Sequence, residues 1–240
     1  YAKKKNITLI IALDCGIRAI NQIDYANEKG IDFIICDHHT PGEKVPEATA
    51  ILNPKQIDCN YPYKELSGCG VGFKLIQALN QKSKGDFSEI ITYLDLLAVS
   101  IGADIVPMTG ENRVFSFYGL QKINKNPRPG LKVLMETANK TRDVTMADLV
   151  FGVAPRINAA GRIENAKQAV DILIEKEYDM AKLLAEKIEK NNVTRKRLDQ
   201  NITKEALKMI DEGKKSTVVY SENWHKGVVG IVASRLIEKH

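Results

Sequence analysis

Short apolar runs alternate with amphipathic stretches in the first part of the chain. Residues 7–16 (ITLIIALDCG) form an apolar, β-branched run that closes in Asp-Cys-Gly, which predicts a buried parallel strand followed by a tight loop. Residues 17–30 carry apolar side chains at helical spacing and end in a glycine, which predicts a helix. Residues 31–36 (IDFIIC) predict a second apolar strand. Together these segments predict a βαβ unit, whose right-handed crossover makes the two strands parallel.

The pattern farther along the chain predicts mainly helices. Residues 49–54 (TAILNP) predict one more short strand. Helices are expected over residues 66–82, 87–103, 110–123 and 145–175, the last one around a Pro-Arg interruption. Residues 178–212 are rich in Lys, Glu, Leu and Ile at three- and four-residue spacing, which predicts one long or broken helix that could bridge two domains. Residues 213–240 predict a strand, a loop and a further helix, so we place a domain boundary near residue 212.

These elements predict an α/β protein with a parallel sheet and flanking helices. The predicted divisions are a first domain over 1–176, a connecting helix over 177–212 and the start of a second α/β domain over 213–240. With 240 residues, of which 44% are hydrophobic, the chain can bury one core, or one core and part of a second.

The composition indicates the cellular compartment of the protein but does not indicate its binding partners. The 35 basic and 30 acidic residues give a formal charge of +5, which fits an ordinary enzyme as well as a protein that contacts polyanions. The four cysteines form no CxxC pair, which favours reduced thiols in a cytoplasm. No apolar stretch reaches the roughly 20 residues that span a bilayer, and no signal peptide is visible. We therefore expect a soluble cytoplasmic protein.

Acidic and imidazole side chains follow both strands of the predicted βαβ unit. Asp14 comes after the first strand, and Asp37, His38 and His39 come after the second. Because the carboxyl ends of adjacent parallel strands lie at one edge of the sheet, we expect these side chains to converge. A mixed oxygen and nitrogen ligand set suits a divalent transition metal, and Mn²⁺ better than a thiolate-rich zinc site. Two such ions would activate a water and stabilise the leaving oxygen in phosphoester hydrolysis.

Each of these positions also has a purely structural interpretation. An Asp-His-His triplet at a strand end can be a solvated turn, and Asp14 can belong to an Asx-type turn. Asp104 lies near the end of the largely apolar residues 94–108, where an unpaired buried carboxylate would be costly. It is either a further metal ligand or a loop residue that faces water before Pro107.

Six segments of the chain carry a family resemblance. They read ALDCG, ICDHHTPG, LSGCGVGFKL, DLLAVSIGADIVPMTGENR, FGVAPRINAAGRIENAKQAV and WHKGVVGIVASRL. In this order and wording the sequence resembles the RecJ single-stranded-DNA exonucleases, members of the DHH phosphoesterase superfamily. The DHH triplet alone would indicate only the superfamily, whereas PRINAAGR together with the Trp-His-Lys-Gly block is characteristic of RecJ. The resemblance covers nearly the whole chain and makes 1–176 a DHH domain and 213–240 the start of a DHH-associated (DHHA1-type) domain.

The resemblance implies a catalytic site at Asp37, His38 and His39. Asp14, His38 and Asp104 would bind metal, His39 would bind metal or contact the scissile phosphate, and Asp37 would orient the histidines. The implied cofactor is Mn²⁺ or Mg²⁺ in a two-metal site. The implied reaction is hydrolysis of phosphodiester bonds from the 5′ end of single-stranded DNA in repair and recombination, by metal-bound hydroxide, and the family suggests a monomer.

The segment APRINAAGR offers candidate contacts to the DNA backbone. Arg156, Asn158 and Arg162 lie within seven residues, and arginine forks match phosphate oxygens. The alternative is that Asn158 caps a turn and that the arginines pair with Glu164 or other acids. The resemblance favours DNA contact, more strongly for the two arginines than for Asn158.

Two further segments have alternative interpretations. By the same resemblance, His225 and Arg235 are candidate phosphate contacts, although Arg235 could be a solvated helix residue and Trp224 simply part of the core. The glycines of residues 67–73 (SGCGVGF) could bring backbone N–H groups to a phosphate, but we favour tight packing of a helix on the sheet.

The sequence departs from the family pattern at both ends. Family members carry an Asp-x-Asp motif on a strand before the one that ends at Asp14, and a Gly-Gly-His segment beyond the first helix of the second domain, and neither occurs here. The chain begins with Tyr1 and ends within a predicted helix. We expect a fragment that lacks two metal carboxylates, binds metal weakly and hydrolyses DNA poorly or not at all.

Two other functions are compatible with parts of the sequence. One is a phosphoesterase of the same superfamily that acts on short oligonucleotides, cyclic dinucleotides or pyrophosphate. The other is a catalytically silent DNA-binding or scaffold module. The PRINAAGR and WHKGVVGIVASR segments favour RecJ over the first alternative. The presence of all five acidic and imidazole residues argues against the second.

Overall fold

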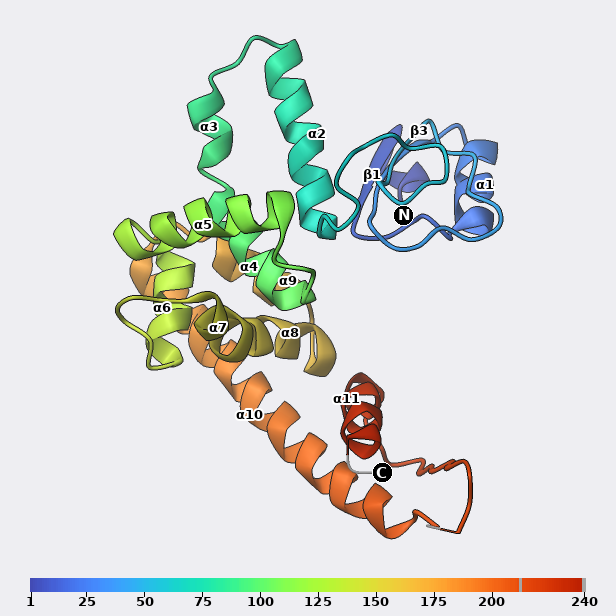
Figure 1. Cartoon of the computed structure of the whole chain (residues 1–240), viewed down its shortest axis with the longest axis vertical. Coiled ribbons are helices and arrows are strands. Elements are labelled where there is room, and N and C mark those ends of the chain that lie inside the picture. Colours follow the sequence, from blue (N-terminus) through green and yellow to red (C-terminus); the bar gives the residue numbers. More distant parts are fainter. Residues whose placement is uncertain (212, 239–240) are drawn as a thin grey trace. The chain divides into compact units, whose positions relative to one another are not determined.

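The computed structural model describes residues 1–211 and 213–238 (Figure 1). Contacts divide the chain into two compact units, which we describe separately. Unit 1 comprises Tyr1–Asn126 and Thr145–Val150, and unit 2 comprises Pro127–Val144 and the chain from Phe151 onward. This division by compactness differs from the predicted domains 1–176, 177–212 and 213–240, which stay a proposal.

Unit 1 contains a parallel three-stranded sheet in the order β1-β2-β3. Helix α1 (Ile20–Glu28) connects β1 to β2, so the predicted βαβ unit and its parallel strands are confirmed. The register pairs Leu13 with Cys36, which brings the carboxyl ends of β1 and β2 level with each other. The strands are Leu9–Leu13, Asp32–Cys36 and Ala50–Leu52.

Strand β1 is less buried than its sequence predicts. It lies at the edge of the sheet and pairs with β2. Its alternate residues Leu9, Ile11 and Leu13 are 46%, 46% and 54% exposed. The expectation of a buried strand was therefore wrong for one face, because an apolar run does not show whether both faces of a strand are covered.

Helices make up the rest of unit 1. The predicted helix over 87–103 is two helices, which break at Thr92 and Tyr93. Helices α4 and α5 pack closely, and a Cβ at Gly119 would lie 2.3 Å from the carbonyl oxygen of Leu94. The described helices of this unit are η1 (Lys3–Lys5), α1, α2 (Gly68–Lys82), α3 (Phe87–Ile91), α4 (Leu94–Asp104), α5 (Gly110–Lys125) and α7 (Met146–Asp148). Phe73 of α2, Ile90 of α3, and Leu97 and Ile101 of α4 form a buried apolar cluster.

Unit 2 is built around the long helix α10, which runs the length of the orange ribbon in Figure 1. Helices α6, α8, α9 and α11 all pack against it. The long helix predicted over 178–212 is confirmed as one 31-residue helix. Its helices are α6 (Pro129–Thr137), α8 (Ala154–Ile163), α9 (Lys167–Ile174), α10 (Tyr178–Lys208) and α11 (Lys226–Ile237), and the π-helical segment η2 (Leu149–Val153) precedes α8.

The structure of this part of the chain differs from the sequence predictions at three points. Helix α6 was not predicted. The predicted helix 145–175 is interrupted twice, by the π-helical segment η2 just before Pro155, as the Pro-Arg pair predicted, and again after Ile163. Pro155 occupies the first turn of α8, where its missing N–H costs nothing. The predicted strand after residue 213 does not form in the described residues 213–225, whereas the predicted helix that follows is α11.

The start of α11 packs on α10 within unit 2. Ile202, Ala206, Val228 and Val232 are buried together, with Trp224 against them. Within residues 1–211 and 213–238, no helix is long and apolar enough to cross a membrane.

Candidate metal centre

His38 lies at the centre of the predicted site, one residue beyond the buried Asp37. Its side chain is 8% exposed, and its Nδ1 lies 3.1 Å from the carbonyl oxygen of Leu66. A carbonyl oxygen only accepts hydrogen bonds, so Nδ1 carries the proton and donates it. In the neutral ring, the other nitrogen, Nε2, then presents a lone pair to the site.

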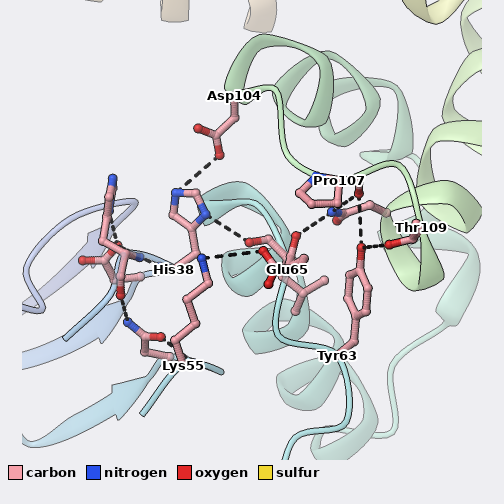
Figure 2. Close-up of polar contacts among 12 residues, drawn as sticks. His38, Lys55, Tyr63, Glu65, Asp104, Pro107 and Thr109 are labelled. Carbon is pink, nitrogen blue, oxygen red and sulfur yellow. Dashed lines mark hydrogen bonds and ion pairs between the residues drawn. The ribbon is translucent and has the colours of Figure 1, made fainter.

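Two carboxylates face this lone pair (Figure 2 shows the one from Asp104). His38 Nε2 lies 3.2 Å from Asp14 Oδ1 and 3.4 Å from Asp104 Oδ2. Nε2 is buried and makes no hydrogen bond within the described residues. An unprotonated nitrogen and two carboxylate oxygens repel one another unless a cation lies between them. The three groups therefore fit a metal ion.

Asp14 reaches this position through an unusual backbone conformation and a nearby glycine. Its φ is +62°, a left-handed value that Asp tolerates better than most residues, and its N–H donates to the carbonyl oxygen of Cys36 at 2.9 Å. A Cβ on Gly68, the first residue of α2, would lie 2.1 Å from Asp14 Oδ1. The glycine at this helix start is thus required for close packing, as predicted for the glycine-rich segment.

Asp104 comes from a different part of unit 1. It is the last residue of α4, and Ile105 ends the helix with a left-handed φ of +54°. Its side chain is 33% exposed, so it is neither a buried unpaired charge nor a loop residue turned away from the site. The structure places Asp104 near His38, and its role as a third carboxylate ligand stays a prediction.

Asp37 does not face the site but holds its loop. Its carboxylate is buried and accepts hydrogen bonds from the backbone N–H groups of Ile17, His38 and His39 at 3.0, 2.7 and 3.1 Å. His39 Nδ1 lies 2.7 Å from the same carboxylate. Burial raises the pKa of Asp37, but the hydrogen bonds from Ile17 and His39 offset it, so the pKa is lower than usual.

His39 completes the metal-binding geometry. Because its Nδ1 donates to Asp37, its Nε2 is free to bind a metal. Ligand atoms of Asp14, His38 and His39 all lie within 4.8 Å of one another. Burial and the neighbouring charge of Asp104 raise the pKa of Asp14, an effect that a bound cation would reverse.

Sequence reasoning did not identify two groups that hold the histidines. The carbonyl oxygen of Leu66 accepts from His38, and Asn53 Nδ2 donates to the carbonyl oxygen of His39 at 2.9 Å. Backbone acceptors leave no signal in a sequence. The Asn-Pro pair after β3 was a possible signal for Asn53, which is buried next to the site loop.

The candidate DNA contacts lie in unit 2, and several of them have structural partners. The side chain of Arg156 is only 12% exposed, and its Nε lies 2.6 Å from a carboxylate oxygen of Glu189. Its two Nη atoms donate hydrogen bonds to the carbonyl oxygens of Gly152 and Thr137. These contacts favour a structural role. Asn158 is exposed on the same helix.

The other three candidates lie at the contacts between α8, α10 and α11. Arg162 Nη1 donates to the carbonyl oxygen of Gly227 at 3.2 Å while the side chain stays exposed. His225 caps α11 by accepting from the N–H of Gly227. Arg235, which is 45% exposed, pairs with the buried Asp199 at 2.8 Å. Their role in holding DNA stays a prediction.

Comparisons with known proteins show which family the chain resembles. Residues 1–101 match the DHH family, N-terminal domain. The chain is 39% identical over 241 residues to the single-stranded-DNA-specific exonuclease RecJ of Bacillus subtilis and 36% identical over 256 residues to that of Escherichia coli, in both cases across 99% of the chain. The chain belongs to the RecJ branch of the DHH family.

Solved RecJ structures show the same fold. A RecJ from Thermus thermophilus in complex with Mn²⁺ matches 99% of the chain with a TM-score of 0.88 and 30% identity, and a manganese-bound exonuclease RecJ matches with a TM-score of 0.87. The chain spans 30% and 44% of the length of the two curated RecJ relatives, and 36% and 61% of the two solved chains. The match is therefore to one part of longer RecJ proteins.

Proposed function

We propose that this RecJ-related chain forms the metal-binding part of an exonuclease that hydrolyses single-stranded DNA. The observation that carries the proposal is the buried His38 Nε2, which makes no hydrogen bond in the described residues and lies 3.2 and 3.4 Å from the carboxylates of Asp14 and Asp104. The RecJ relatives, whose names specify single-stranded DNA, and the manganese-bound RecJ structures support the substrate and the metal.

We assign different roles in such a site to the individual residues. Asp14, His38, His39 and Asp104 would hold Mn²⁺ or Mg²⁺, which when bound would polarise the phosphodiester and supply a nucleophilic water. Asp37 holds the ring of His39 through Nδ1 and the backbone of His38, while the Leu66 carbonyl holds the ring of His38. The proposed polarity, from the 5′ end, and the proposed two-metal site follow from the family resemblance.

The DNA-binding part of the proposal concerns unit 2. Arg162, Asn158 and Arg235 keep exposed side chains and remain the candidates for phosphate contact, while Arg156 and His225 act mainly through their contacts within unit 2. The domain limits 1–176, 177–212 and 213–240 belong to the same proposal.

Metal titration of the whole chain tests the proposed site. Mn²⁺ should raise the melting temperature of the wild type by mass action, and His38→Ala should abolish most of that increase because it removes the central ligand. His225→Ala is the matched control, because it removes a histidine that lies outside the site. Equal Mn²⁺ stabilisation of wild type and His38→Ala would contradict the proposal.

A further inference from the structure

Asn112 lies in the first turn of α5, and its side chain is fully buried. Its amide Nδ2 donates two hydrogen bonds, to the carbonyl oxygen of Glu65 at 2.5 Å and to that of Pro107 at 3.0 Å. Figure 2 labels Glu65 and Pro107 and shows both on the same side of His38 and Asp104. One side-chain amide therefore joins two loops that are far apart in the sequence.

Each of these loops supports one side of the candidate metal centre. Glu65 precedes Leu66, whose carbonyl oxygen accepts the Nδ1 proton of His38. Pro107 lies three residues after Asp104, the last residue of α4. The two bonds of Asn112 thus connect the acceptor that fixes the His38 tautomer to the loop that carries the facing carboxylate.

Neighbouring contacts hold the same two loops without touching the ligands. Tyr63 Oη donates to the carbonyl oxygen of Pro107 at 3.2 Å (Figure 2), and Tyr61 Oη donates to Glu111 at 2.6 Å. Glu111 also pairs with Lys74 of α2. Two consecutive side chains in the first turn of α5, Glu111 and Asn112, therefore bind the segment 61–66. Of these two, Asn112 forms the hydrogen bond next to Leu66, to the carbonyl oxygen of Glu65.

The chemistry of the position requires an amide. A single NH₂ group provides two donors for two carbonyl oxygens, whereas an aspartate of the same shape would turn a carboxylate oxygen toward them. The Oδ1 of Asn112 is buried without a hydrogen-bond partner in the described residues. An unsatisfied buried acceptor is costly, so an apolar residue would serve better if only packing mattered.

We propose that Asn112 is a positioning residue that sets the tautomer of His38 and its distance to Asp104. This inference rests on the proposed metal-binding function. Without the amide, the Leu66 carbonyl is free to move away from Nδ1, and the proton can then shift to Nε2, where it blocks the ligand lone pair.

The test compares Asn112→Ala with Ile123→Ala in the whole chain. Ile123 is buried on the same helix, so its truncation leaves a cavity and lowers stability without touching the site. We expect the dissociation constant for Mn²⁺, measured by the loss of the free-ion electron paramagnetic resonance signal, to rise about 10- to 100-fold in Asn112→Ala. It should remain within about twofold of wild type in Ile123→Ala.

Ring ¹⁵N shifts of His38 in metal-free protein provide a second readout. The wild type and Ile123→Ala should show the Nδ1–H tautomer, and Asn112→Ala should show a mixture with Nε2–H. Asn112→Asp, which keeps the side-chain shape, is expected to behave like Asn112→Ala and replaces it if the alanine variant does not fold.

The outcomes separate this inference from the proposed function. Wild-type affinity and an unchanged tautomer in either Asn112 variant would overturn the positioning role while leaving the metal site intact. If the wild type binds no Mn²⁺, or His38→Ala binds it as well as the wild type, the proposed function itself fails.

Discussion

At the scale of single residues, the two acids next to the histidines have opposite tasks. Asp14 is exposed and faces the ligand nitrogen, while Asp37 is buried and uses its oxygens for the loop. The sequence predicted both residues from their place at strand ends, and it predicted the orienting role of Asp37 from the family resemblance. The structural role of Asn112 could not be predicted, because its partners are backbone carbonyls that only the tertiary fold brings together.

Asp37→Asn tests whether the charge of this carboxylate stabilises the loop. The folded pKa of Asp37 is below the unfolded value of about 3.9, so its contribution is present above that value and is lost as the pH falls through the folded pKa. We expect the variant to be less stable by about 1.5–3 kcal/mol at pH 7 and the difference to shrink well below pH 4.

Urea denaturation of both proteins at pH 7 and at pH 3 measures this difference. Asp24→Asn, which changes an exposed residue of α1, is the control and should follow the wild type at both pH values. A stability deficit of Asp37→Asn that stays constant with pH would contradict a stabilising contribution from the charge of this carboxylate.

At the scale of elements, the spacing of apolar residues predicted the helices and strands that depend mainly on local sequence. The βαβ unit, α2, α5, α10 and α11 follow from apolar spacing and helix ends. Helix α6 begins with Pro129 and Gly130, and a Cβ on Gly130 would lie 1.8 Å from the carbonyl oxygen of Ile172 in α9, so tertiary packing selects that glycine. The expected strand after residue 213 does not form because a strand needs a partner, and the described residues provide none there.

Gly68→Ala tests how the start of α2 shapes the metal centre. The added methyl group would displace the Asp14 carboxylate, because it would lie 2.1 Å from Oδ1, yet the helical backbone accepts alanine. We expect the dissociation constant for Mn²⁺ to rise about tenfold while the circular dichroism spectrum is retained.

Gly70→Ala is the matched control, because Gly70 lies two residues after Gly68 in the first turn of α2. Its Cβ would lie 3.3 Å from Ser67 Oγ and does not approach Asp14. If the two alanine variants bind Mn²⁺ with the same affinity, the steric argument for Gly68 is wrong.

At the scale of the whole molecule, the two units are stabilised differently. Unit 1 joins a small sheet to helices around the candidate metal centre, whereas unit 2 packs its helices along α10 through buried apolar residues and polar contacts. Among those contacts, Arg235 of α11 neutralises the buried Asp199, which is 1% exposed. Loss of the arginine would remove the ion pair of this buried carboxylate and leave only the nearby charge of Arg195 to balance it.

We therefore expect Arg235→Ala to lower the free energy of unfolding by about 2 kcal/mol, less than for a fully buried pair because Arg235 is half exposed. Circular dichroism during urea denaturation measures the change. Lys214→Ala is the control, since its pair with Asp211 is exposed on both sides and should contribute less than about 1 kcal/mol. Equal losses in the two variants would contradict a buried-charge effect.

The chain has a single tryptophan, Trp224, whose indole N–H donates to Glu205 at 2.9 Å within unit 2. The candidate metal centre lies in unit 1. Intrinsic tryptophan emission therefore reports on unit 2, whereas the proposed cation site lies in unit 1. Any shift of that emission on adding Mg²⁺ would measure energetic communication between them without an attached dye.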